Sequence, residues 1–315
     1  MQIYEYKPIG MPTLGATAVA LGFFDGVHLA HRELIKRTVK EAKSRGLKSA
    51  VFTFSSECTS LKSSAPRIYS TEEKLDIIST LGVDAVIIAE FNSVSSMTAE
   101  QFISDTLVGD LDARVVLAGY NFRFGKGALG DAGALKDGMA EHGREAVILG
   151  EYSYSGKPIS SSLIREALAE GDVALAAELL GAPYRLRARV IRGRGEGRGM
   201  GIPTVNTDIP PGRLLPRLGV YRTAVPIDGK IYTGLTNVGE CPTFGARAVH
   251  AETYILGFDA DLYGRDVNIY FLGFLRDERT FQNAEELLLQ IERDKARATS
   301  ENERDISKWT EYGLS

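Results

Sequence analysis

The chain has 315 residues, of which 44% are hydrophobic and 25% are charged, a composition typical of folded globular proteins rather than disordered ones. Its 37 basic and 41 acidic residues nearly balance, which argues against a protein drawn to nucleic acid or membrane by its overall charge. Two cysteines, Cys58 and Cys241, cannot staple a fold of this size and have no metal-ligand spacing. The amino terminus lacks a secretion-signal pattern, and no apolar run is long enough to span a bilayer. These features predict a cytoplasmic protein of about two domains.

The first half of the chain alternates short apolar runs with stretches of helical periodicity. We expect strands at 18–21, 50–54, 85–88, 115–118 and 146–149, and helices over 29–45, 71–81, 98–107 and 163–180. This alternation predicts a parallel sheet covered by helices on both faces. Such sheets bind ligands beyond the carboxyl ends of their strands.

A different pattern begins near residue 184. Arginines and apolar residues alternate over 185–190 with the period of a half-buried strand. Further strands are expected at 219–227, 230–238, 249–257 and 266–273. Short turns between them indicate a small antiparallel barrel.

The barrel pattern is followed by a helix over 283–297, and we expect the charged segment 299–308 to be solvated. The change of pattern at Pro183 predicts a domain boundary there. The domains are then 1–183 and 184–315.

The segment 22–31, Gly-Phe-Phe-Asp-Gly-Val-His-Leu-Ala-His, follows the first expected strand and begins a helix. Its glycines permit a tight turn close to a ligand, and a helix N-terminus favours phosphate. His28 and His31, two of only four histidines, are one helical turn apart and can face one ligand. Protonated imidazoles beside phosphates can stabilise charge when a nucleotide's α-phosphate is attacked. The alternative is a helix cap with incidental surface histidines.

This segment resembles the G-x-F-D-G-x-H-x-G-H motif of nucleotidyltransferases. Segments 119–125 and 159–165 resemble the flavin- and nucleotide-site loop and the second phosphate-binding signature of bacterial FAD synthetases. The resemblance implies a Rossmann-like α/β nucleotidyltransferase domain in which His28 and His31 are catalytic. It also implies nucleotide or flavin contacts from Gly22, Phe24, Asp25, Gly26, Asn121, Ser161, Ser162 and Arg165.

Glycine occupies every second position of 193–201, Gly-Arg-Gly-Glu-Gly-Arg-Gly-Met-Gly, which favours a flexible flap able to close over phosphates; a linker is the alternative. The flap runs into 201–206, Gly-Ile-Pro-Thr-Val-Asn, which resembles the G-x-P-T-x-N motif of riboflavin kinases. A rigid proline turn can present the Thr204 hydroxyl and the Asn206 carbonyl to Mg²⁺. Without the other motifs, an ordinary β-turn is the alternative.

The resemblance continues in collinear order to about residue 297 and implies an antiparallel β-barrel riboflavin kinase domain with a C-terminal helix. It implies that Glu252 is the general base toward the ribityl 5′-hydroxyl, although periodicity alone places Glu252 on the outer face of its strand. It further implies Mg²⁺ at Thr204 and Asn206. The implied nucleotide or flavin contacts in this domain are Gly195, Gly199, Gly201, Pro203 and Arg276.

As a whole, the chain is similar to bifunctional riboflavin kinase/FMN adenylyltransferases. That similarity implies phosphorylation of riboflavin by ATP to FMN, then transfer of AMP from ATP to FMN, giving FAD and pyrophosphate. ATP, riboflavin and FMN are then its small-molecule partners, and Mg²⁺ is its cofactor. Neither nucleic acid nor a membrane is expected as a partner, and the oligomeric state stays open.

Three departures from the motifs leave alternatives open. Ala30 stands where the motif has glycine, Ser162 stands where threonine is usual, and 55–59 replaces a loop that contains Pro-His-Pro. One alternative is therefore a riboflavin kinase whose adenylyltransferase module is weak or inactive. Another is a flavin- or nucleotide-binding regulator without turnover.

Overall fold

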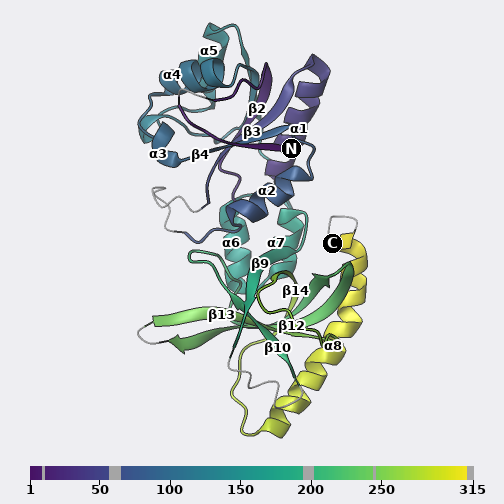
Figure 1. Cartoon of the computed structure of the whole chain (residues 1–315). Coiled ribbons are helices and arrows are strands. Elements are labelled where there is room, and N and C mark those ends of the chain that lie inside the picture. Colours follow the sequence, from purple (N-terminus) through teal and green to yellow (C-terminus); the bar gives the residue numbers. More distant parts are fainter. Residues whose placement is uncertain (9–10, 57–64, 194–201, 244–245, 311–315) are drawn as a thin grey trace. The chain divides into compact units, whose positions relative to one another are not determined.

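The chain folds into two compact units, Met1–Ser161 and Ser162–Ser315 (Figure 1). The computed structural model describes residues 1–8, 11–56, 65–193, 202–243 and 246–310. Three glycines of the predicted flap, Gly195, Gly199 and Gly201, lie outside these described residues, as does most of the segment that replaces the Pro-His-Pro loop. None of the described helices is both long enough and apolar enough to cross a membrane.

The first unit is built on a six-stranded sheet in the order β1-β4-β3-β2-β5-β6, and all its neighbouring strands are parallel. The strands are β1 (Gln2–Glu5), β2 (Thr17–Leu21), β3 (Lys48–Phe54), β4 (Ala85–Ala89), β5 (Ala113–Gly119) and β6 (Glu145–Leu149). The helices are α1 (Leu29–Arg45), α2 (Thr71–Ser79), α3 (Phe91–Val94), α4 (Ala99–Gln101), the π-helix η1 (Phe102–Asp110), the 3-10 helix η2 (Lys126–Ala128) and α5 (Ala132–Glu141). A small hairpin, β7 (Ser153–Tyr154) and β8 (Lys157–Pro158), follows. The predicted parallel sheet is confirmed, with β1 as an added edge strand.

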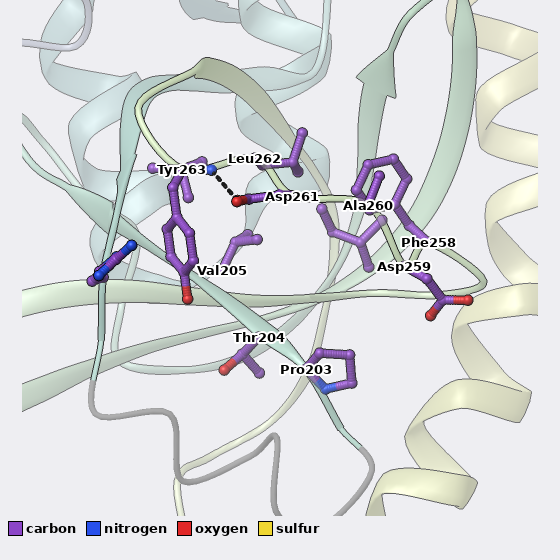
Figure 2. Close-up of a pocket in the computed structure, with 12 residues that line it drawn as sticks. Pro203, Thr204, Val205, Phe258, Asp259, Ala260, Asp261, Leu262 and Tyr263 are labelled. Atoms are coloured by element: carbon purple, nitrogen blue, oxygen red, sulfur yellow. Dashed lines mark hydrogen bonds between the residues drawn. The ribbon is translucent and has the colours of Figure 1, made fainter.

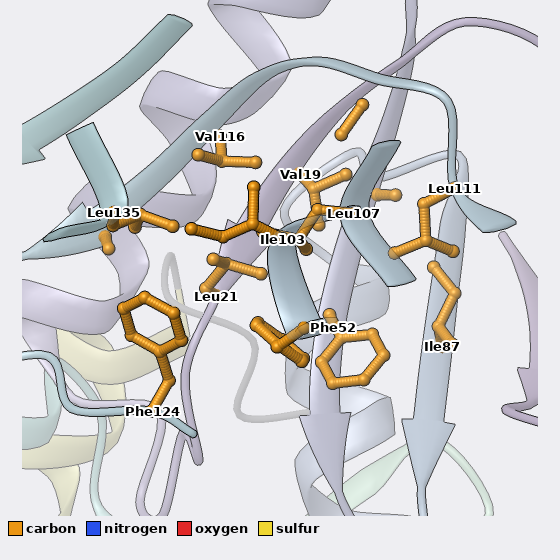
Figure 3. Close-up of a cluster of buried hydrophobic side chains, with 14 of the residues drawn as sticks. Val19, Leu21, Phe52, Ile87, Ile103, Leu107, Leu111, Val116, Phe124 and Leu135 are labelled. Atoms are coloured by element: carbon orange, nitrogen blue, oxygen red, sulfur yellow. The ribbon is translucent and has the colours of Figure 1, made fainter. Parts of the chain in front are cut away.

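Helices cover both faces of the sheet, as expected. Successive residues of a strand point to opposite faces. On one face, Leu21 packs in a cluster with Leu107 of η1 and Leu135 of α5 (Figure 3). On the other face, Ala20 packs in a cluster with Ile35 of α1. Burial on both sides explains why the strands read as continuous apolar runs.

The single helix expected over 163–180 is two helices, α6 (Ser161–Glu170) and α7 (Val173–Leu180). Gly171 has a φ of 81°, a left-handed conformation that ends a helix. Asp172 then caps α7, because its Oδ1 accepts a hydrogen bond from the Leu175 N–H at 2.9 Å. Gly171 therefore ends α6, and Asp172 begins α7.

The second unit contains a closed barrel in the order β10-β13-β12-β11-β14-β9, and all its pairs are antiparallel. The strands are β9 (Tyr184–Ile191), β10 (Thr204–Asp208), β11 (Gly219–Ile227), β12 (Lys230–Thr243), β13 (Ala246–Ile255) and β14 (Asp266–Arg276). The predicted barrel is confirmed. Thr204 and Asn206, which a proline turn was expected to present, lie within strand β10, which pairs with β13 and β9 and directly follows Pro203. Proline is tolerated at a strand's start, where no ladder hydrogen bond is needed.

Helix α8 (Ala284–Thr310) continues well past the expected end at 297. The expectation that 299–308 is solvated holds only in part: six of these ten residues are exposed, but Asn302 is fully buried. Its Nδ2 donates to Thr223 O of β11 at 2.9 Å. Arg222 of β11 pairs with carboxylates of the same helix, among them Glu301 at 2.9 Å. The charged segment is thus helical and partly held against the barrel.

Helix α7 packs against the barrel. Ala177 of α7 shares an apolar cluster with Ala224 of β11, Tyr270 of β14 and Trp309 of α8. By packing, the two compact units therefore divide at the start of α6, earlier in the chain than Pro183. The domain boundary at Pro183 stays a prediction.

Candidate functional sites

The turn after β2 lies where the strand order of the sheet changes direction. β2 and β5 are neighbours, and the chain leads from β2 to β3 on one side and from β5 to β6 on the other. A crevice at the carboxyl ends of such strands is the usual ligand site of an open parallel sheet. Residues 22–28 follow β2, and Asn121, which is exposed, follows β5. Two of the segments singled out in the sequence therefore follow neighbouring strands at the same edge of the sheet.

The backbone of this turn is unusual. Phe24 and Val27 have φ values of 54° and 40°, and Gly26 has a φ of 85°. Positive φ is rare for residues other than glycine and commonly marks a functional turn. Phe24 is fully buried, and a Cβ on Gly22 would lie 2.9 Å from its ring. Gly22 is therefore required for the Phe24 side chain to fold back beneath the turn.

Asp25 and Ser161 hold the turn in place. The Asp25 side chain is buried, and its Oδ1 accepts a hydrogen bond from the Ile68 N–H at 3.0 Å. The Ser161 hydroxyl donates to the backbone carbonyl of Asp25 at 2.8 Å. The resemblance predicts that both residues contact the nucleotide; the contacts described here fix the loop that carries the site.

His28 and His31 lie together at the start of α1. His28 is the N-cap residue, and its Nδ1 accepts a hydrogen bond from the His31 N–H at 3.4 Å. The two imidazole rings stack with their centroids 3.5 Å apart, and the Phe24 ring lies edge-on to His31 at 5.2 Å.

Burial keeps both histidines uncharged. It lowers the pKa of His28 from 6.5 to about 4. The pKa of His31 is also well below its usual value, first because the ring is desolvated and then because His28 and Lys74 are close. The expected protonated imidazoles therefore require a bound anion, because without one both rings are neutral at pH 7.

Lys74 is part of this region and was missed from the sequence. It lies on α2 with a side chain 1% exposed. Its Nζ donates to Phe54 O at 2.5 Å, to Phe23 O at 3.3 Å and to Thr53 Oγ1 at 3.3 Å. Lys74 is four residues before the buried Ile78, so both lie on the apolar face of the helix. A lysine on an apolar helix face is the sequence signal that could have identified this residue.

The second phosphate-binding signature forms the first turns of α6. Ser162 is exposed in the first turn, and Arg165 follows one turn later. This placement agrees with a hydroxyl and a positive charge near a helix N-terminus, a favourable environment for phosphate.

In the barrel, Thr204 and Asn206 of β10 meet Glu252 of β13. Asn206 is directly opposite Glu252 in the strand register. Thr204 Oγ1 donates to Glu252 Oε1, and Asn206 Nδ2 lies 3.5 Å from the same oxygen. Residues on either side of Glu252, Ala251 and Thr253, are fully buried. The predicted outward orientation of Glu252 is confirmed, and its partners on β10 share that outer face.

These side chains suit a hard cation. A hydroxyl, an amide carbonyl and a carboxylate are the oxygen donors that Mg²⁺ prefers. Among the described residues, no group of three or more His, Cys, Asp or Glu side chains is placed to hold a metal ion. Gly193 leaves room for the Asn206 side chain. A Cβ at position 193 would lie 2.2 Å from Asn206 Nδ2.

A pocket of about 760 Å³ adjoins Thr204 (Figure 2). One wall is Pro203, Thr204 and Val205, and another is the loop 258–263 between β13 and β14. Tyr263 and Arg192 lie at the pocket, with the guanidinium carbon 5.5 Å from the ring centroid.

Arg276 at the end of β14 is held by helix α8. Its Nε donates to Asp294 Oδ2 at 2.9 Å, and Gln290 Nε2 donates to Asp294 Oδ1 at 2.9 Å. Asp294 is only 5% exposed. A buried, doubly hydrogen-bonded carboxylate therefore orients the arginine, and nothing in the local sequence marked Asp294 as its partner.

Comparison with known proteins covers both units. Residues 11–163 match the FAD synthetase family, and residues 180–301 match the riboflavin kinase family. A bifunctional riboflavin kinase/FMN adenylyltransferase of Bacillus subtilis (strain 168) is 34% identical over 290 residues, covering 90% of this chain and 91% of the relative. The protein of the same name from Escherichia coli (strain K12) is 34% identical over 285 residues, covering 89% and 91%. A crystal structure of a macrolide-efflux protein from Streptococcus pneumoniae has a TM-score of 0.85 at 28% identity and covers 95% of this chain and 99% of that one.

Proposed function

The chain belongs to the bifunctional riboflavin kinase/FMN adenylyltransferase family, and from this premise we propose which of its residues perform each reaction. The protein makes FMN from riboflavin and FAD from FMN, and ATP is a substrate of both steps. The barrel unit carries the kinase reaction, and the parallel-sheet unit carries the adenylyl transfer.

In the kinase reaction, Glu252 is the general base. Its carboxylate accepts the proton of the ribityl 5′-hydroxyl as that oxygen bonds to the γ-phosphorus of ATP, and ADP leaves as the bridging bond breaks. Thr204 and Asn206 would hold Mg²⁺ together with the ATP phosphates. When bound, Mg²⁺ supplies positive charge to the transferring phosphoryl group. The hydrogen bond from Thr204 to Glu252 supports this assignment, because it joins a proposed ligand and the proposed base.

The pocket beside Thr204 is the proposed nucleotide site of the kinase. Its volume of about 760 Å³ is within the usual size of small-molecule sites, roughly 300–1,000 Å³. Arg192 and Tyr263 line it, and they offer a positive charge and an aromatic face to a nucleotide. Arg276, oriented by Asp294, is a proposed flavin or nucleotide contact.

In the adenylyl transfer, the turn over 22–28 and the N-terminus of α1 bind the ATP phosphates. A phosphate oxygen of FMN attacks the α-phosphorus of ATP, and pyrophosphate leaves when the bond between the α- and β-phosphates breaks. No protein nucleophile is needed. His28 and His31 donate hydrogen bonds to the charge that develops on the phosphate oxygens. Asn121 follows β5, the strand next to β2, and is a proposed ligand contact.

The stacked pair His28 and His31 carries the assignment of the first site, and reciprocal variants test both sites. The double variant His28→Ala/His31→Ala should abolish FAD formation from supplied FMN while riboflavin phosphorylation stays normal. Glu252→Gln should do the reverse, lowering FMN formation about 100-fold or more. Exposed residues provide matched controls in His142→Ala and Glu303→Gln.

Product analysis with riboflavin, ATP and Mg²⁺ separates the alternatives. The wild-type chain should give FMN first and then FAD. FMN without FAD would mean that the adenylyltransferase module is inactive. Undiminished FAD formation by the double histidine variant would disprove the first site, and normal phosphorylation by Glu252→Gln would disprove the base.

A further inference from the structure

A buried lysine lies at the carboxyl ends of two sheet strands, next to the turn that carries His28. The Lys74 side chain is 1% exposed, and among the described residues its Nζ donates to Phe23 O, Thr53 Oγ1 and Phe54 O. Burying an ammonium group is costly unless its protons are satisfied. Hydrogen bonds to these oxygen atoms offset that cost for Lys74, and an apolar residue at this position could not make them.

The acceptors belong to both strands. Phe23 O follows the end of β2, whereas Thr53 Oγ1 and Phe54 O belong to the end of β3. The Thr53 hydroxyl also donates to Phe23 O at 3.0 Å. Lys74 lies 5.1 Å from the centroid of the Phe23 ring, which stacks on Phe54. The ammonium group thus ties the start of the phosphate-binding turn to the neighbouring strand.

The charge of Lys74 also acts on His31. Desolvation of the ring is the main cause of the lowered pKa of His31, and the nearby His28 and Lys74 lower that pKa further. Phe24 also contacts His31, with its ring edge-on, but Phe24 is uncharged and adds no charge to the surroundings of the imidazole. Inside a protein, a fixed charge near a site acts more strongly than it does in water.

We propose that Lys74 is a positioning residue for adenylyl transfer: its buried ammonium group fixes the turn between β2 and α1 and places a positive charge near the His28–His31 pair. The inference rests on the proposed location of adenylyl transfer at this turn. Negative charge on the phosphates rises toward the leaving pyrophosphate, and a preorganised positive charge stabilises it without reorganisation during the reaction. Lys74 itself touches protein atoms, so it acts through the turn and its field.

The test uses the full chain, because the kinase reaction in the second unit is an internal control. Lys74→Met keeps the length of the side chain but removes its charge and its donors. We expect FAD formation from supplied FMN to fall at least tenfold in kcat, with a smaller change in the KM for ATP. Riboflavin phosphorylation should stay within twofold. Lys40→Met, at an exposed position on α1, is the matched control and should change neither activity.

A second variant separates charge from local packing. Thr53→Val removes one acceptor of Lys74 and the hydroxyl bond to Phe23 O but leaves the charge in place. We expect it to retain most of the FAD formation. An NMR titration of His31 gives a readout that packing alone would not move: its pKa should rise in Lys74→Met and stay near the wild-type value in Thr53→Val.

The outcomes are distinct. Full FAD formation by Lys74→Met would overturn the proposal and leave the histidine site standing. So would a loss no larger than that of Thr53→Val, or an unchanged His31 titration, even if Lys74→Met also lowers the thermal stability of the first unit. A different result would disprove the proposed location of adenylyl transfer, namely undiminished FAD formation by His28→Ala/His31→Ala.

Discussion

The imidazole rings of His28 and His31 stack with their planes inclined by 17° and their centroids 3.5 Å apart. Two protonated rings at that distance would repel each other strongly. The free protein therefore holds the pair neutral, and two measurable consequences concern protons.

The first consequence is a loss of stability in acid. His28 has an ordinary pKa of 6.5 when unfolded and about 4 when folded, so the unfolded chain binds more protons between these values. The free energy of unfolding of the first unit should therefore fall as pH drops from 6.5 to about 4, by about 3 kcal/mol from His28 alone. Hydrogen exchange of peptides from β2 and α1 across this range measures it.

His28→Asn is the matched variant for this experiment. Asparagine keeps an acceptor at the N-cap of α1 but does not titrate. The pH dependence of exchange in β2 and α1 should become shallower. The same slope in wild type and variant would contradict the burial of a neutral His28.

The second consequence concerns ATP binding at the first site. Phosphates raise the pKa of a nearby imidazole, so a ring that is neutral in the free protein takes up a proton when the nucleotide binds. Affinity for ATP should then increase as pH falls from 8 toward 6. Calorimetry in buffers of different ionisation enthalpy should report net proton uptake, and His28→Ala/His31→Ala should reduce it. Equal proton uptake by that variant would assign the proton to another group.

A third prediction concerns the metal in the kinase site. Thr204→Val removes both a proposed Mg²⁺ ligand and the donor to Glu252. We expect the Mg²⁺ concentration for half-maximal FMN formation to rise ~10-fold or more. Thr204→Ser retains the hydroxyl and should restore most of the affinity. Removal of divalent ions with a chelator should stop FMN formation in all three proteins, and FMN formation that resists the chelator would exclude Mg²⁺ from this site.

A fourth prediction concerns the end of α8. Asn302→Ala leaves the buried carbonyl of Thr223 without this partner, which should lower the free energy of unfolding of the barrel by about 1–3 kcal/mol. The chain has a single tryptophan, Trp309, and it is buried, so its fluorescence in a urea titration follows this unit. Glu303→Ala, exposed on the same helix, is the control. An unchanged midpoint for Asn302→Ala would mean that this part of α8 adds nothing to stability.

Periodicity predicted the architecture well because the buried faces leave a strong pattern. Continuous apolar runs marked the strands of the parallel sheet, and alternation over 185–190 marked β9. Periodicity also placed Glu252 on the outer face of β13. Local signals that compete with periodicity were harder to use. Gly171 and Asp172 separate two helices within one apolar stretch. The charged residues of 299–308 suggested a solvated segment, but they belong to a helix whose polar side chains contact the barrel.

The partners of the site residues could not be predicted, because they come from distant parts of the chain. Asp25 meets Ile68, and Arg276 meets Asp294, through hydrogen bonds that no local pattern encodes. Lys74 was detectable in principle as a charged residue on an apolar helix face. The acceptors described for its Nζ, however, depend on the arrangement of β2 and β3.

The strand β10 carries Thr204 and Asn206 and is hydrogen-bonded on both sides, to β9 and to β13. A strand at the free edge of a sheet can fray alone, but β10 can leave only if two ladders break together. The lifetime of the kinase site is therefore tied to the lifetime of the whole barrel. Heat should extinguish riboflavin phosphorylation in one step with the unfolding of this unit, without an earlier phase in which the site alone melts.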